Sequence, residues 1–146
     1  MSEFKLVPFK AEDLVNGFEI YKQYFYKIVE QAFGWDEEFQ KHRFAQRYEL
    51  SWFQWIHVDN KNIGYVCSHY PANEIHISLL IIYKEFQKNN YGSKVMEWVR
   101  DQALKDGRKV TLSSFKNNQK ANSFYQKLGY SIYNQDQYFY DFIQSR

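Results

Sequence analysis

Cysteine is nearly absent from this sequence, and its absence excludes several kinds of protein. Cys67 is the single cysteine, so the chain has no internal disulfide and no cysteine-rich metal cluster, and no metal is expected. A lone thiol suits a reducing compartment, which predicts a cytoplasmic location. Cys67 ends the apolar run Ile63–Cys67. That setting favours a small buried hydrophobic side chain over a nucleophile.

Long hydrophobic runs and an excess of one charge are also missing. The longest apolar run, Leu79–Tyr83, is far shorter than the roughly 20 residues that a membrane helix needs. The beginning, MSEFKLVPFK, lacks the basic start and apolar stretch of a signal peptide. The net charge is only +2, from 19 basic and 17 acidic residues, whereas nucleic-acid binding needs a clustered basic face. Neither a membrane nor a nucleic acid is therefore expected as a partner.

Aromatic residues are abundant, at 21% of the chain, with 13 tyrosines and 13 phenylalanines. Such side chains can fill a core or line a substrate slot, and composition does not choose between the two. A length of 146 residues predicts one domain, residues 1–146, with a core large enough to fold without disulfides.

Hydrophobic periodicity predicts a mixed order of helices and strands. Strands are expected at 5–9, 52–58, 63–70, 74–82 and 109–114, and in a closing hairpin of 131–133 with 138–143. Helices are expected at 11–33, 36–48, 92–105 and 119–128, with Phe39 and Phe44 of the second facing inward. Antiparallel strands thus precede a parallel β-α-β crossover. This predicts an α/β protein with a mixed, predominantly antiparallel sheet and helices on both faces.

Two segments carry spacings that point to one family. In IHISLLIIYKEFQKNNYGSKVMEWV, Gln87 and Gly92 lie between a strand and a helix. In NNQKANSFYQKLGY, residues 117–130, the spaced positions are Asn118, Ala121, Tyr125, Gly129 and Tyr130. Over about residues 50–143 the chain resembles the GNAT superfamily of N-acetyltransferases. The patterns of that family are Gln/Arg-x-x-Gly-x-Gly/Ala and Asn-x-x-Ala-x-x-x-Tyr-x-x-x-Gly-Phe.

The resemblance implies acetyl-CoA as co-substrate and direct attack of a primary amine, from a small molecule or a peptide, on its thioester. By position in the family, the backbone of Leu80, Ile81 and Ile82 would pair with the pantetheine arm. The pyrophosphate would lie on the loop and helix start. The residues expected there are Gln87, Lys88, Asn89, Asn90, Tyr91, Gly92 and Ser93. Backbone N–H groups at a helix N-terminus suit such an anion, although a plain polar loop before a helix glycine has the same pattern.

Asn90 departs from the family pattern, because it stands where the first glycine is expected. Asparagine tolerates a left-handed backbone better than most residues with a side chain, so we expect the turn to persist.

Tyr125 is the expected acid, because the family uses the tyrosine of this motif to protonate or stabilise the leaving thiolate. Ala121, Phe124 and Leu128 form a stripe that should face the core, which would leave Tyr125 on its margin, within reach of a cleft. A packing role is the alternative for Tyr125. Asn118 is expected to contact coenzyme A or to cap the helix, and these roles are compatible.

Residues that could take a proton from the amine alternate on one face of strand 74–82, at Glu74, His76 and Ser78. His76 and Glu74 are the candidate bases, since histidine titrates close to neutral pH. A structural histidine, or a water chain with no side-chain base, is the alternative.

Trp35, Asp36 and Glu37 lie between the first two helices, where the family has its acceptor site. A ring and carboxylates could receive a cationic amine, although an acidic helix start is the favoured interpretation. Two other functions stay open at this point: a coenzyme A-binding regulatory module without turnover, and an aromatic-rich interaction domain. The chain could be a monomer or a homodimer.

Overall fold

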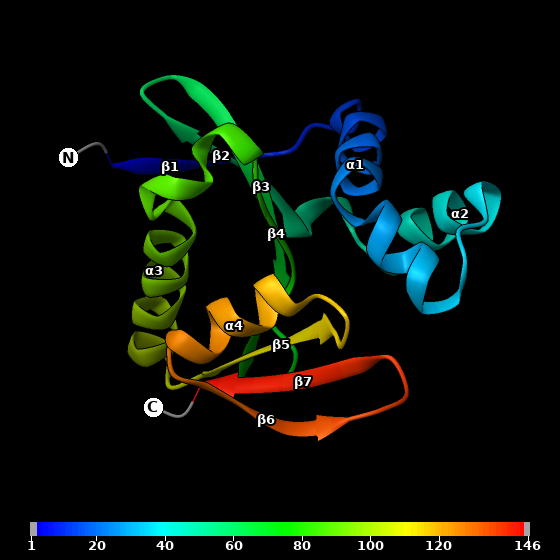
Figure 1. Ribbon diagram of the computed structural model, residues 1–146. Helices are drawn as coiled ribbons and strands as arrows, with labels where there is room; N and C mark the ends of the chain where they lie inside the picture. Colours follow the sequence, from blue (N-terminus) through cyan, green and yellow to red (C-terminus); the bar gives the residue numbers. More distant parts are fainter. Residues whose placement is uncertain (1–2, 145–146) are drawn as a thin grey trace. The chain divides into compact units, whose positions relative to one another are not determined.

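The computed structural model describes residues 3–144 (Figure 1). Its elements are β1 (Phe4–Pro8), α1 (Asp13–Phe33), α2 (Glu37–Arg47), η1 (Leu50–Trp52), β2 (Phe53–Val58), β3 (Lys61–His69), β4 (Glu74–Ile82), η2 (Lys84–Asn89), α3 (Tyr91–Asp106), β5 (Lys109–Phe115), α4 (Gln119–Lys127), β6 (Tyr130–Gln135) and β7 (Phe139–Gln144). The order and type of every expected helix and strand are confirmed. The 3₁₀ helices η1 and η2 were not predicted.

Contacts divide the chain into two compact units, which are described in turn. The first holds the chain up to Cys67 together with Leu79–Phe86, and the second holds Ser68–Ser78 together with the chain from Gln87 onward. Strand β4 therefore contributes its end to the first unit and its beginning to the second. The expectation of a single domain stays a prediction.

Antiparallel strands β1, β2 and β3 form the sheet of the first unit. β1 pairs with β2 from Phe4 opposite Val58, and β2 pairs with β3 from Phe53 opposite Cys67. The hairpin between β2 and β3 turns at Asp59 and Asn60, whose φ angles are 52° and 65°. Positive φ at both central residues is the mark of the type I′ turn, which matches the twist of paired strands.

Aromatic side chains fill the core of the first unit. Phe9 stacks on Trp55 with ring centroids 4.2 Å apart and on Phe53 at 4.9 Å. The polar atoms of this core find partners, as buried polar groups must. The Trp55 indole N–H donates to Asp13, and the Tyr65 hydroxyl donates to the Gly17 carbonyl over 2.8 Å. Much of the aromatic content is thus accounted for by packing.

Helix α2 corrects one expectation about the first unit. Phe44 is buried, at 6% exposure, as predicted, but Phe39 is 54% exposed, so the prediction that Phe39 faces inward is wrong. Phe39 lies in the first turn of α2, where its backbone N–H is held by the Asp36 carboxylate. A spacing of five residues puts the two side chains roughly 140° apart around a helix, and only Phe44 reaches the aromatic core.

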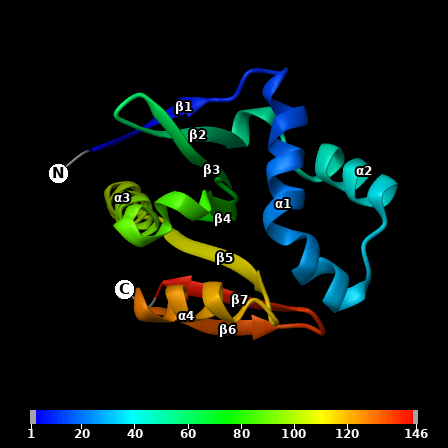
Figure 2. The ribbon, with the colours of Figure 1, turned by 45° about the horizontal axis from the view of Figure 1, so that its top comes forward.

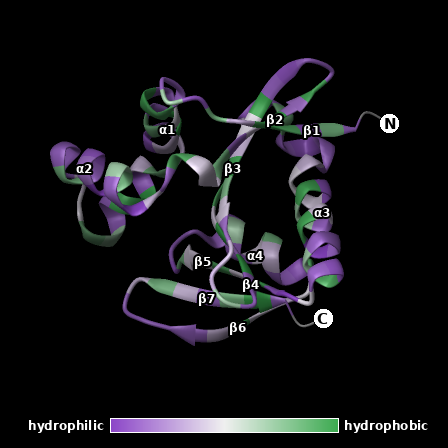
Figure 3. Cartoon of the chain, turned by 180° about the vertical axis from the view of Figure 1, so that it is seen from behind, coloured by the Kyte–Doolittle hydropathy of each residue, from purple (hydrophilic) through white to green (hydrophobic). Residues whose placement is uncertain are grey.

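The second unit contains the parallel crossover. Its strand order is β4-β5-β7-β6, with β4 parallel to β5 and the other pairs antiparallel. Helix α3 joins the two parallel strands and buries Val95, Met96, Val99 and Ala103, the predicted face. Figure 3 shows hydrophobic and hydrophilic residues alternating around α3, as in an amphipathic helix. Helix α4 lies along the β6–β7 hairpin (Figure 2).

These elements confirm the α/β class with a mixed sheet. Across residues 3–144, no helix is both long enough and apolar enough to cross a membrane.

Candidate active site

The predicted phosphate loop is an exposed turn that leads into α3. Gln87, Lys88, Asn89 and Asn90 are exposed. Asn90 is the N-cap of α3, with φ 64° and ψ 17°, so the predicted left-handed turn is confirmed without glycine. This conformation costs asparagine less than other residues with a Cβ.

The start of α3 has the features that an anion site needs. The Lys94 N–H donates to the Asn90 carbonyl over 3.1 Å, which is the first bond of a regular helical turn. The N–H groups of Tyr91, Gly92 and Ser93 precede that bond, and the first N–H groups of a helix have no intrahelical acceptor. Together with the positive end of the helix dipole, they favour a bound phosphate.

A hydrogen bond joins the phosphate loop to the second motif. The Lys120 ammonium donates to the Gln87 side-chain oxygen over 2.7 Å, so the first turn of α4 lies beside the loop. Lys120 is a neighbour of the predicted phosphate loop that the sequence reasoning missed. Its place two residues after Asn118, in the first turn of the motif helix, was the available signal.

Asn118 caps α4. Its side-chain oxygen accepts from the Ala121 N–H over 3.3 Å, so the capping role is confirmed. A contact between Asn118 and coenzyme A stays a prediction.

The rotation of α4 differs from the expectation. Asn122 and Tyr125 are its buried residues, at 8% exposure each, whereas Ala121, Phe124 and Leu128 are only half-buried. The predicted placement of Tyr125 at the margin is therefore wrong. Its ring contacts Tyr130 and Phe142, with centroids 6.1 and 6.0 Å away, and these partners from β6 and β7 set the rotation.

Burial raises the pKa of the Tyr125 phenol well above its ordinary value, with the nearby Tyr130 as a smaller cause. A phenol is protonated at neutral pH in any case, and the raised pKa of Tyr125 keeps it a hydrogen-bond donor at higher pH as well. Its catalytic role stays a prediction.

Glu74 and His76 lie on one face of β4, and the structure joins them through a residue of β5. Along β4 buried and half-buried positions alternate, with Glu74, His76 and Ser78 on the half-buried side. The Thr111 hydroxyl donates to Glu74 Oε1 over 2.7 Å and lies 2.9 Å from His76 Nδ1. Their role as bases stays a prediction.

Leu80, Ile81 and Ile82 form the end of β4 in the first unit. Ile81 and Ile82 are buried, whereas Leu80 is half-buried. Gly64 of β3 passes so close that a Cβ there would overlap the Ile81 carbonyl oxygen. The part of β4 in the second unit pairs with β5 over Glu74–Ile77.

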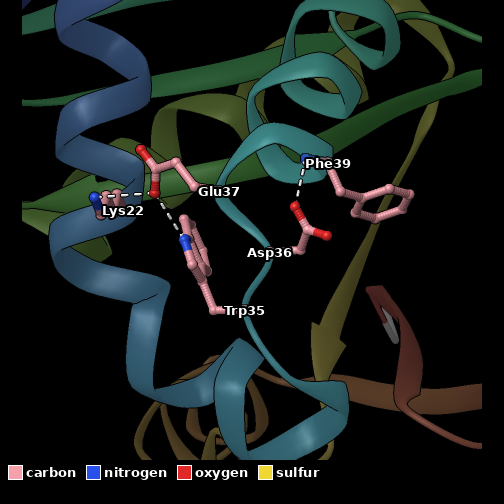
Figure 4. A network of polar contacts seen from close by, with 5 residues as sticks. All are labelled: Lys22, Trp35, Asp36, Glu37 and Phe39. Atoms are coloured by element: carbon pink, nitrogen blue, oxygen red, sulfur yellow. Dashed lines mark hydrogen bonds and ion pairs between the residues drawn. The ribbon is translucent and has the colours of Figure 1, made fainter.

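The predicted acceptor residues also lie in the first unit, and each has a structural partner (Figure 4). Glu37 accepts from the Trp35 indole N–H over 2.8 Å and pairs with Lys22 at 3.0 Å. These two contacts lower the pKa of Glu37, the indole more than the ammonium. Asp36 caps α2 by accepting from the Phe39 N–H over 3.1 Å. A role for Trp35, Asp36 and Glu37 in binding an amine stays a prediction.

Cys67 is fully buried, and burial raises the pKa of its thiol. A thiolate nucleophile is thus disfavoured there. Within the described part of the chain, no group of three or more histidine, cysteine or acidic side chains is arranged to hold a metal ion.

Comparison with known proteins places these features in a family. A profile of the acetyltransferase (GNAT) family matches residues 14–130. The chain belongs to this family and is therefore an acetyltransferase. A search of curated proteins found no match.

Solved structures share the fold at low sequence identity. The PaiA N-acetyltransferase of Thermoplasma acidophilum, in complex with coenzyme A, is 17% identical with a TM-score of 0.75, over 99% of each chain. An acetyltransferase of Thermus thermophilus is 18% identical with a TM-score of 0.70, over 96% of this chain and 95% of that one. Naa50 of Arabidopsis thaliana, in complex with the bisubstrate analogue CoA-Ac-MVNAL, is 14% identical with a TM-score of 0.65, over 98% and 99%.

Proposed function

We propose that this acetyltransferase uses acetyl-CoA and transfers the acetyl group to a primary amine of a small molecule or peptide. The observation that carries the proposal is the Lys120–Gln87 hydrogen bond, which joins the phosphate loop to the motif helix. The left-handed turn at Asn90 supports it, because the turn presents the start of α3 to an anion. Similar folds are known with coenzyme A and with a CoA–peptide conjugate bound.

Two segments, one in each unit, are proposed to contact the coenzyme. Backbone N–H groups of residues 91–93, with Lys88 and Lys120 nearby, would hold the pyrophosphate. Leu80–Ile82 would pair with the pantetheine arm as an added strand. We further expect a cytoplasmic monomer or homodimer of one domain, with no nucleic acid, membrane or metal as partner.

In the proposed reaction the acceptor enters as an ammonium ion and loses one proton to a base, with His76 or Glu74 as candidates. The free amine attacks the thioester carbonyl, and a C–N bond forms. The tetrahedral intermediate then collapses, the C–S bond breaks, and the electron pair leaves on sulfur. The nitrogen loses its second proton, and the thiolate takes up one proton to give coenzyme A and the acetylated amine.

Tyr125 is the proposed partner of the leaving sulfur. An ordinary thiol has a pKa of about 8.5, and the pKa of the buried Tyr125 phenol lies far above that. The phenol would therefore stabilise the thiolate by donating a hydrogen bond, without giving up its proton completely.

Acetyl transfer can be measured directly on the purified chain. We would incubate it with acetyl-CoA and a panel of amines: a polyamine, an amino sugar, a peptide with a free N-terminus and a peptide with an internal lysine. Mass spectrometry of the product should show one added acetyl group, in step with release of the coenzyme A thiol. The control is the same amine already N-acetylated, which should give no product. Binding of acetyl-CoA without an acetylated product from any amine would contradict the proposal.

A further inference from the structure

Thr111 connects the two candidate bases at the parallel strand pair of the second unit. β4 and β5 place His76 directly opposite Thr111, and Glu74 opposite Lys109. Thr111 is 1% exposed, although threonine is usually found at the surface. A buried hydroxyl needs partners, and this one has a carboxylate and an imidazole within hydrogen-bond distance.

The chemistry of the three groups fixes the direction of both hydrogen bonds. A hydroxyl has one proton to donate, whereas an ionised carboxylate only accepts. The Thr111 proton is therefore committed to Glu74 Oε1, over 2.7 Å. The contact of 2.9 Å to His76 then requires Nδ1 to be the donor. A neutral His76 so held carries its proton on Nδ1 and its lone pair on Nε2.

We infer that Thr111 is a positioning residue: its hydroxyl links the Glu74 carboxylate to His76 Nδ1 and keeps Nε2 as the nitrogen that accepts the proton of the acceptor amine. When Nε2 takes that proton, the ammonium ion becomes a free amine and His76 becomes an imidazolium. The Glu74 charge then acts on the imidazolium through the hydroxyl. This inference rests on the proposed function, because it assigns a step in amine acetylation.

Other polar and titratable groups lie around Glu74, Thr111 and His76 and contribute to the electrostatic environment of these residues. The ring of His69, at the end of β3, meets that of His76 edge-on, with centroids 5.4 Å apart. The Arg108 guanidinium donates to the carbonyl oxygens of Ala72 and Glu74, over 3.0 and 3.1 Å. The pKa of Tyr133 on β6 is raised mainly by burial, and to a smaller extent by the charges of Asp141 and Glu74. The Arg108 bonds fix the backbone at the start of β4, which holds Glu74 in place for the hydroxyl.

The tautomer of His76 can be read by NMR on the wild-type protein alone. Long-range proton–nitrogen correlation of the imidazole groups, assigned with a His76→Gln variant, should show neutral His76 protonated on Nδ1. Two substitutions then separate the hydroxyl from the shape of the side chain. Thr111→Val keeps the shape and removes the hydroxyl, and should shift the proton away from Nδ1. Thr111→Ser keeps the hydroxyl and should preserve the wild-type tautomer.

Turnover gives a second readout. Thr111→Val should lower kcat about tenfold or more with little change in KM for acetyl-CoA, and Thr111→Ser should stay within about threefold of wild type. Loss of a whole general base costs roughly 10²–10⁴-fold, and the base itself is kept in both variants. A neutral wild-type His76 protonated on Nε2 would overturn the inference, as would a Thr111→Val variant with wild-type tautomer and kcat. Failure of the proposed function is a different result: no amine would be acetylated, whatever the tautomer of His76.

Discussion

At the scale of single residues, the side chain of Tyr125 combines a ring packed in the core with a phenol that is proposed to act in the reaction. Tyr130 and Phe142 hold its ring, and burial keeps its phenol protonated. A tyrosine packed in this way is held in place, and its phenol keeps one proton that it can donate. This is what stabilisation of a developing thiolate requires, because a preorganised donor needs no rearrangement during the reaction.

Tyr125→Phe should lower kcat about 10- to 100-fold and leave the affinity for acetyl-CoA nearly unchanged, because a hydrogen bond to a charged group stabilises by about 1.5–3 kcal/mol. Steady-state kinetics with calorimetric binding would check both halves. Unchanged kcat would remove Tyr125 from the reaction.

Tyr130→Phe is the matched control, since it deletes the same atom from the neighbouring ring. The Tyr130 hydroxyl is buried and has no hydrogen-bond partner among the described residues. Leaving a buried polar group unpaired costs about 1–3 kcal/mol. The substitution should therefore raise the free energy of unfolding by about 1 kcal/mol, measured by urea denaturation, with kcat unchanged. A clear loss of stability would mean that this hydroxyl has a partner.

At the scale of elements, the turn from η2 into α3 depends on one left-handed residue. Asn90→Val places a β-branched side chain at φ 64°, which should cost roughly 1–2 kcal/mol of stability and weaken acetyl-CoA binding. Asn90→Gly should be neutral or stabilising and bind at least as tightly. Thermal unfolding and calorimetry on both variants would test this. Equal behaviour of valine and glycine would show that the turn does not matter.

The helices and strands could be predicted because their signals are local. Gly107 ends α3 in the left-handed conformation, and the apolar spacing of α3 identifies its buried face. The rotation of α4 could not be predicted, because Phe124 and Tyr125 are both apolar enough to be buried in a helix of nine residues. Contacts with Tyr130 on β6 and Phe142 on β7 decide which of the two side chains is buried.

The candidate site divides in the same way. Gln87, Asn90 and Asn118 follow from motif spacing along the chain. Thr111 and Lys120 do not, because their importance depends on residues opposite or beside them, His76 and Gln87. Thr111 can be connected with the site only once the register of β4 with β5, which puts it opposite His76, is known.

At the scale of the whole molecule, buried tyrosines make the stability of the folded state depend on pH in the alkaline range. Burial raises the pKa of Tyr48 and of Tyr130 to about 12, and raises those of Tyr21, Tyr65 and Tyr125. These groups bind their protons more tightly in the folded state, so their contribution to stability is complete below about pH 10. It is lost as the pH rises toward 12. Tyrosinate absorbance followed alongside circular dichroism should show exposed tyrosines ionising first and the buried ones only as the chain unfolds. Ionisation of every tyrosine near its ordinary pKa in a folded protein would contradict this.

The central claim, acetyl-CoA bound on the loop before α3, is tested most directly by calorimetry with wild type and Gly92→Glu. A carboxylate at residue 92 would stand against the phosphates and repel them. Leu104→Glu is the matched control, because it adds the same side chain to α3 at a position that is 65% exposed. Binding by wild type and Leu104→Glu, with none by a folded Gly92→Glu, is the predicted result. Equal binding by all three proteins, or by none of them, would contradict the account.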